Sequence, residues 1–450
     1  MTSRSETTPR VGFLASDGKL ARAAQPLVRF LNIEAAGGVL LVVAAVAALV
    51  WANSPFRASY ETLWATEIRL ELGSYVFEED LGHLINDLLM ALFFFVVGME
   101  IKREAVVGEL RDRRAIALPV MAALGGMLVP AGLFLAVNMG GAGVDGWGVP
   151  MATDIAFALG VLALMGSRVP APLKVLLLTL AIVDDIGAIV VIAIFYTESI
   201  STGWLMIAGG LVFVVWLLHR LKVIYVPVLV GVGLLLWLAV YESGIHATIA
   251  GVVMGLFTPA RPRLREADAN QVVDALENRA DLDASEVHAT AVLIKASVSA
   301  CDRSIDALHP WTSFLIVPLF ALANAGIELS GESFTDPSAV FIGVVVGLVV
   351  GKLVGVTLFS WLAVKLGLAR LPDGVRWSHI AGVAALAGIG FTVSLFIAGL
   401  AFSGELLADA KVAILAASVV SSILGAALLW RSFRFGSGEE ATAEAVAAEA

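Results

Sequence analysis

Long apolar runs recur along the whole chain, and they constrain the fold more than any other feature of the sequence. An α-helix needs about 20 residues to cross the hydrocarbon core of a bilayer, and the length of each run is close to that. Only 15% of the residues are charged, whereas soluble domains contain about 25%. We therefore predict an all-α polytopic membrane protein. Twelve candidate spans lie near residues 35–53, 84–100, 115–137, 148–165, 173–196, 202–218, 223–240, 245–258, 310–327, 338–364, 380–401 and 411–430.

Lysine and arginine predict the orientation of these spans. With both termini in the cytoplasm, the cytoplasmic loops carry 25 of the 29 Lys and Arg residues. The opposite side carries three, Arg57, Arg69 and Lys411, and Lys352 lies within a span. Basic residues near span ends accumulate on the cytoplasmic side of a membrane, so we expect both termini there.

The spans divide the chain into three parts. A cytoplasmic segment covers 1–34, a twelve-span domain covers 35–430, and an acidic tail that we expect to be disordered covers 431–450. Within the domain, the charged and alanine-rich residues 259–309 predict a cytoplasmic loop.

One external segment, 54–80, follows the first span. Its stretch EIRLEL, from Glu67 to Leu72, alternates polar and apolar residues, a pattern that favours a strand. We expect a small external β-hairpin that pairs with a second copy of the chain. A loop with a chance alternation is the alternative.

Two spans show signs of interruption. In GVPMATDIAFALG, Pro150 comes shortly before Thr153 and Asp154, and proline restricts the preceding residue while Thr and Asp favour helix N-caps. In the eleventh span, AGIGFTVSLFIAG (387–399) has two glycines around one isoleucine. Paired interrupted spans in corresponding halves of a membrane protein indicate inverted repeats with a binding site at the midplane. An ordinary helix with an early proline and a glycine-rich packing helix are the alternatives.

Three further charges lie inside spans. Asp184 and Asp185 are adjacent in LAIVDDIGAIVVIAIFYT, and Lys352 follows glycines spaced four residues apart. A charged side chain at the bilayer centre, whether Asp or Lys, costs about 2.5–3.5 kcal/mol on insertion scales. The ammonium of Lys352 should therefore pair with a carboxylate. Asp154, Asp184 and Asp185 are the candidates, and a purely structural ion pair would leave the other carboxylates unexplained. Carboxylate oxygens bind hard cations and also protons, and competition between the two is the chemistry of an exchanger.

Several sequence blocks around these residues resemble those of a known transporter family. The blocks ATDIAFALG, VDDIGAI, HATIAG, LHPW and GIGFTVSLFIA, with the lysine of VGKLVG, are similar to those of the NhaA-type sodium/proton antiporter family, in the same order. That family is itself an example of inverted repeats, so the repeat and the resemblance are not independent.

The resemblance implies an electrogenic sodium (or lithium)/proton antiporter of the bacterial inner membrane that extrudes Na+ in exchange for external H+ and serves sodium and pH homeostasis. Asp184 and Asp185 would bind the ion and the protons. Lys352 would neutralise a carboxylate, most directly Asp184, and Thr153 and Asp154 would balance the ends of the broken helices.

The resemblance also implies a pH-responsive cluster. Glu100, Arg103 and Glu104 in GMEIKRE match the family's cytoplasmic cluster, as does His309 in LHPW. Here the chain departs from the family pattern, because Ile305 and Asp306 stand where a Glu-His pair often precedes that block. Without the resemblance, we would interpret these residues as an ordinary cytoplasmic loop that follows the positive-inside rule.

Other classes fit the residues less well. An intramembrane aspartyl protease would need a GxGD signature, and the chain has none. A membrane prenyltransferase would need further acidic and basic partners beside the aspartate pair. An anion carrier is disfavoured because two or three carboxylates within the membrane face one lysine. A sodium-coupled symporter stays open. We expect no enzymatic activity, no cofactor and no nucleic-acid partner, only membrane lipid, the transported ions and a second copy of the chain.

Overall fold

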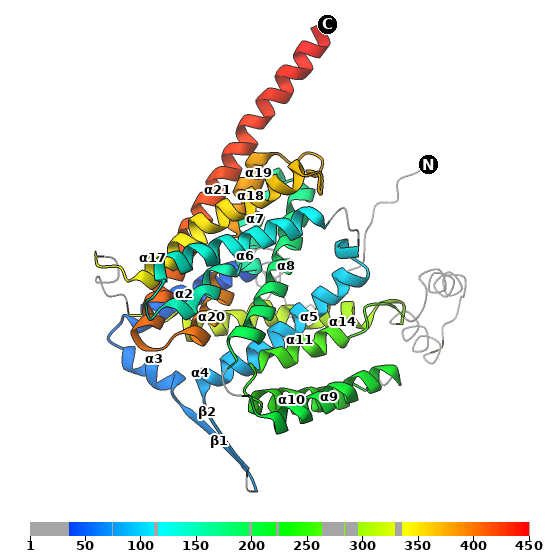
Figure 1. The fold of residues 1–450 in the computed structure, drawn as a ribbon. Coiled ribbons are helices and arrows are strands. Elements are labelled where there is room, and N and C mark those ends of the chain that lie inside the picture. The colour runs from blue at the N-terminus through cyan, green and yellow to red at the C-terminus, as the bar shows by residue number, and fades with distance from the viewer. Residues whose placement is uncertain are drawn as a thin grey trace.

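The computed structural model describes residues 36–73, 75–111, 116–197, 200–221, 225–262, 283, 296–328 and 335–449 (Figure 1). The predicted N-terminal segment 1–34 and most of the predicted loop 259–309 lie outside the described residues.

The described chain is a bundle of apolar helices, as predicted. Eight helical segments are long and apolar enough to cross a membrane, and up to ten when each of two bent helix pairs counts as one span. The apolar helices α10 and α11 are shorter. All twelve expected ranges therefore fall on apolar helices. Only eight to ten of these helical segments are long enough to cross a membrane. The helices are α2 (Ala36–Ala52), α3 (Arg57–Trp64), α4 (Leu81–Leu84), α5 (Met90–Val106), α6 (Ala117–Asn138), α7 (Ile155–Leu164), α8 (Ala171–Phe195), α9 (Thr202–Arg220), α10 (Val226–Glu242), α11 (Thr248–Phe257), α14 (Ala300–Trp311), α15 (Val317–Asn324), α17 (Ala339–Val345), α18 (Lys352–Lys365), α19 (Trp377–Leu386), α20 (Phe391–Ala401) and α21 (Gly404–Glu449).

Short irregular helical turns join or extend several of these helices. Three π-helical turns each sit inside a continuous span, η1 (Ile85–Leu89), η5 (Thr312–Ile316) and η6 (Val346–Gly351). The 3-10 helix η3 (Val144–Met151) precedes α7, and two shorter 3-10 turns are η2 (Glu109–Arg111) and η4 (Gly166–Arg168). A π-turn adds a residue to the helix and turns the side chains that follow it, and η6 ends directly before Lys352.

Glycine allows two of the spans to approach closely. A Cβ added at Gly355 of α18 would lie 2.2 Å from the carbonyl oxygen of Gly125 in α6, and one at Gly351 would lie 2.8 Å from Cα of Pro130. The ridge of glycines spaced four residues apart therefore packs against α6, as small residues do between membrane helices.

The β-hairpin predicted from EIRLEL is present. Strands β1 (Glu67–Leu72) and β2 (Tyr75–Asp80) pair antiparallel, with Arg69 opposite Glu78 and Leu72 opposite Tyr75. The predicted range 54–80 is too wide, however, because Arg57–Trp64 is a helix. That stretch lacks the alternation that distinguishes β1.

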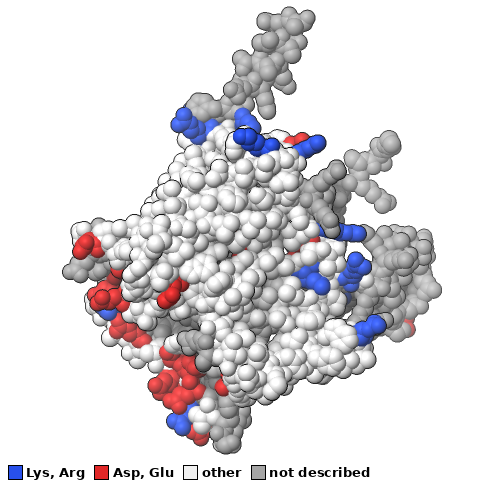
Figure 2. Space-filling model, in the orientation of Figure 1, with Lys and Arg blue, Asp and Glu red and all other residues white. Residues whose placement is uncertain are grey.

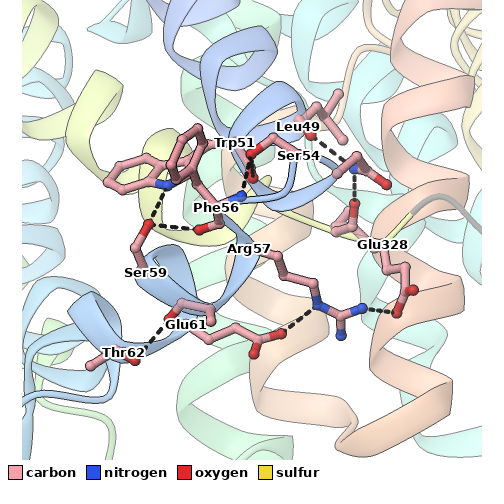
Figure 3. A network of polar contacts seen from close by, with 12 residues as sticks. Leu49, Trp51, Ser54, Phe56, Arg57, Ser59, Glu61, Thr62 and Glu328 are labelled. Atoms are coloured by element: carbon pink, nitrogen blue, oxygen red, sulfur yellow. Dashed lines mark hydrogen bonds and ion pairs between the residues drawn. The ribbon is translucent and has the colours of Figure 1, made fainter.

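Helix α3 is fastened to the bundle at its turn after α2 (Figure 3). Arg57 Nε lies 2.7 Å from Glu61 Oε1, and Arg57 Nη1 lies 2.5 Å from Glu328 Oε2. The Trp51 indole donates a hydrogen bond to Ser59, and the Tyr60 hydroxyl contacts the carbonyls of Leu322 and Ala323 at the end of α15. These contacts fix where the hairpin leaves the bundle.

The last helix, α21, reaches into the predicted tail 431–450. It continues to Glu449 and projects from the bundle (Figure 1), and the disorder that we expected there stays a prediction. Alanine and glutamate, which dominate the last dozen residues, have high intrinsic helix propensity.

Candidate ion-binding site

The site lies where two interrupted helices cross. The 3-10 helix η3 gives way to extended residues 152–154 before α7 begins, and α19 and α20 bend by 47° across residues 387–390. The two gaps touch, because the Asp154 amide donates to the Ile389 carbonyl at 2.6 Å and the Thr153 hydroxyl donates to the Ala387 carbonyl at 2.8 Å. Both interruptions predicted from the sequence are therefore present.

Asp154 caps two helix N-termini at once. Its Oδ1 accepts a hydrogen bond from the Phe157 amide of α7 at 2.9 Å. Its Oδ2 accepts from the Thr392 amide of α20 at 3.1 Å and from the Thr392 hydroxyl at 2.6 Å. A helix N-terminus carries about half a positive charge, so one buried carboxylate faces two positive ends.

Lys352 occupies the opposite electrostatic position. Its side chain is fully buried, and its ammonium donates to Asp184 Oδ2 at 2.8 Å, to Thr153 Oγ1 at 3.0 Å and to the Met151 carbonyl. Met151 ends the 3-10 helix η3, and the C-terminal end of a helix is negative. The lysine thus contacts one negative helix end and one carboxylate.

The two aspartates of α8 have different surroundings. Both are buried, at 1% and 3% exposure, but only Asp184 reaches Lys352. Within the described chain, Asp184 Oδ1 has no hydrogen-bond partner, and the Asp185 carboxylate has neither a hydrogen bond nor an ion pair. Successive helical residues point about 100° apart, so a single cation from α18 reaches one of them and leaves the other open.

Comparisons with known proteins identify the family of this chain. Residues 28–429 match the family model described as Na+/H+ antiporter 1. The chain belongs to this family. It is 48% identical over 413 residues to a protein of Rhodopirellula baltica named Na(+)/H(+) antiporter NhaA, covering 90% of this chain and 93% of that one.

Two further relatives cover a similar share of the chain. A protein of Frankia alni named Na(+)/H(+) antiporter NhaA 3 is 46% identical and covers 91% of this chain and 89% of its own length. One of Oleidesulfovibrio alaskensis named Na(+)/H(+) antiporter NhaA is 48% identical and covers 90% and 93%. The family is one of transporters, and the chain is a multi-pass membrane protein.

The cluster at the end of α5 is only partly assembled. Arg103 Nη2 lies 3.2 Å from Glu104 Oε1, and Glu100 lies one turn earlier on the same helix. His309, on α14, is exposed, and in the described residues no hydrogen bond or ion pair joins its side chain to that cluster. The structure therefore groups three of the four residues that the family resemblance named together.

Two hydroxyls that support the crossing were not assigned a role from the sequence. Thr392 binds Asp154 as described above, and Ser418 of α21 accepts from the Phe391 amide at 3.3 Å. Both serve the first turn of α20. The role of Thr392 could have been predicted from the sequence, since a threonine after a glycine-rich gap is typical of a helix N-terminus. Ser418 lies 26 residues further along the chain, so its contact with Phe391 can be found only from the folded structure.

The oxygen atoms at the site limit what can bind there. In the described part of the chain, no group of three or more His, Cys, Asp or Glu side chains could hold a metal. A cation at Asp184 and Asp185 would therefore be completed by carbonyl, hydroxyl or water oxygens. Carboxylate, carbonyl and water oxygens are hard ligands that suit hard cations.

Proposed function

We propose that this chain is an electrogenic sodium (or lithium)/proton antiporter in which the ion and protons compete for Asp184 and Asp185. The observation that carries the proposal is the unequal pair on α8. One carboxylate is held by Lys352, while its neighbour, equally buried, has no partner among the described residues.

A buried carboxylate without a partner must acquire one. Leaving it charged and alone in a low-dielectric interior is very unfavourable, so it takes up either a proton or a cation. Because Asp185 cannot hold both at once, binding Na+ releases a proton. Alternating exposure of this site to the two sides of the membrane turns that competition into exchange.

Lys352, Thr153 and Asp154 keep the crossing charge-balanced in both loaded states. When Na+ occupies the aspartates, Lys352 can give up its contact with Asp184 and remain on Thr153 and the negative end of η3. Asp154 stays on the two positive helix ends. Asp185 then releases one proton and the Lys352–Asp184 pair releases a second when Na+ separates its two members, so more than one proton is exchanged for each Na+ and the exchange is electrogenic.

The charge distribution supports an orientation with both termini in the cytoplasm of a bacterial inner membrane. Acidic side chains gather at the end that carries the hairpin, and basic side chains gather away from it, around the base of α21 and at the right of the view (Figure 2). Protons then enter from outside as Na+ leaves, which serves sodium and pH homeostasis.

We further propose a homodimer and a modulatory role for the α5 cluster. The hairpin β1–β2 projects beyond the bundle (Figure 1), where a second copy can extend its two-stranded sheet. Glu100, Arg103, Glu104 and His309 adjust the pH at which exchange turns on. No cofactor is required by this mechanism.

The test is cation-driven dissipation of a pH gradient in proteoliposomes that contain the purified full chain. Adding Na+ or Li+ should dissipate an imposed gradient, and a potential clamped by valinomycin and potassium should change the rate. A Na+ flux without proton movement would indicate a symporter and refute the proposal.

A further inference from the structure

A basic and aromatic surface forms where α19 begins and α21 leaves the bundle. It contains five exposed residues, Arg376, Trp377, Trp430, Arg431 and Arg434. Neither the ion site nor the α5 cluster includes any of them. Figure 2 shows basic side chains gathered at this end of the molecule, around the base of the projecting C-terminal helix.

Specific contacts hold this surface together across two helices. The Arg376 guanidinium donates to the Ser432 carbonyl at 3.1 Å, and the hydroxyls of Ser378 and Ser432 lie 2.6 Å apart. These bonds join the start of α19 to the turn of α21 where its membrane span ends. Arg376 is thereby placed beside the helix turn that carries Arg431 and Arg434.

The aromatic residues lie at the ends of spans. Trp430 is 54% exposed, and the Arg434 guanidinium lies over its ring, 5.6 Å from the centroid. Trp377, the first residue of α19, is 36% exposed. Tryptophan favours the level of lipid headgroups, and the stretch of α21 that qualifies as a span ends at Arg434.

An apolar stripe runs from this surface along α21 toward the membrane centre. Val419, Ile423 and Trp430 are exposed by about half or more, and their spacing puts them on one helix face with Arg434. A ligand with an anionic head and an apolar chain matches this arrangement. The head would meet arginine, and the chain would follow the stripe.

We propose that this surface binds the phosphate headgroup of an anionic phospholipid. Three guanidiniums provide planar donors that match phosphate oxygens. Arg376, Arg431 and Arg434 carry three positive charges, and Asp373 is the carboxylate nearest to them in sequence. Clusters of basic residues next to a span recruit anionic lipid, and the bound headgroup would tie α19 to α21.

The test is native mass spectrometry of the full-length protein with phosphatidylglycerol or phosphatidylcholine. The test variant is the triple substitution Arg376→Gln, Arg431→Gln and Arg434→Gln. The control variant, Arg111→Gln, Arg168→Gln and Arg261→Gln, removes the same charge from three other exposed arginines. Transport is not measured, so the result is independent of the proposed exchange.

Wild type and control should retain phosphatidylglycerol in preference to phosphatidylcholine. The test variant should lose that preference by at least fivefold, the equivalent of one basic residue at about 1 kcal/mol. Equal loss in the two triple variants would overturn the site, because it would reduce the effect to overall charge.

Two further arms exclude other occupants. Displacement of phosphatidylglycerol by millimolar inorganic phosphate would show an anion site rather than a lipid site and would overturn the proposal. Retention that occurs only after removal of residues 436–450 would show that the acidic tail fills the surface in the intact chain, and it would overturn the proposal too. Retention unaffected by either change supports it.

Discussion

The helix crossing and the end of α5 both concentrate charge, but they hold it in different ways. At the crossing, Asp154, Asp184 and Lys352 are buried, and each contacts residues from another part of the chain. At the end of α5, Arg103 and Glu104 are sequence neighbours that contact each other and remain partly exposed. Buried charges depend on their partners far more than exposed ones do. Substitutions at the crossing should therefore abolish function or stability, whereas those on α5 should only adjust it.

The largest effect is expected at Asp185. Asparagine has nearly the same shape but cannot exchange a cation for a proton, so Asp185→Asn should abolish Na+/H+ exchange in proteoliposomes while the protein stays folded. Asp409→Asn, near the start of α21, serves as the control and should retain exchange. Exchange by Asp185→Asn near the wild-type rate would remove the basis of the site assignment.

The next effect concerns the ion pair. Lys352→Ala leaves the Asp184 carboxylate buried without its cation, and breaking such a pair typically costs about 3–5 kcal/mol. The melting temperature in detergent should fall, and adding Asp184→Asn to the same chain should restore part of it. Additive losses in this double-mutant cycle would mean that the two residues are not coupled.

A smaller loss is expected at Thr392, whose hydroxyl binds Asp154 at 2.6 Å. Thr392→Val removes that hydrogen bond but keeps the amide and the side-chain shape, and hydrogen bonds to charged groups contribute about 1.5–3 kcal/mol. Stability should fall by about that amount and Na+ affinity should weaken. Ser422→Ala is the control, since the Ser422 hydroxyl donates only to the Ser418 carbonyl of its own helix. Equal effects in the two variants would argue against a special role of the crossing.

At the end of α5, Glu104→Gln should shift the pH profile and preserve the maximal rate. The substitution removes the negative charge that faces Arg103. The surrounding acidic groups then bind protons less tightly, so the pH profile of transport should move to lower pH. Transport measured from pH 6 to 9 checks this, with the exposed Glu405→Gln as control. An unchanged profile would reduce the cluster to an ordinary positive-inside loop.

The smallest effect on transport is expected from the hairpin. Replacing residues 67–80 with a short glycine-serine linker removes β1 and β2 but leaves α3 and its contacts with Glu328 and α15. The protein should shift toward monomer in detergent and keep its exchange activity. An unchanged oligomeric mass would exclude the hairpin as the dimer contact.

The sequence predicts the parts of this fold that depend on local chemistry. Proline before Thr153 and Asp154 and the glycines at 388 and 390 indicated both helix interruptions, and the alternation of EIRLEL indicated a strand. Insertion cost indicated that Lys352 needs a carboxylate, but three aspartates were candidates. The contact with Asp184 depends on how α18 and α8 lie relative to each other, which no local pattern encodes, and only the family resemblance singled Asp184 out.

The central claim is that Na+ and protons compete for the α8 carboxylates, and proton release tests it most directly. Na+ is added to purified protein in weakly buffered detergent solution, and the pH is recorded. The account predicts that wild type releases protons on addition of Na+ or Li+, that choline chloride at equal ionic strength has no effect, and that Asp184→Asn and Asp185→Asn release none. No release from wild type, or equal release from Asp185→Asn, would contradict it.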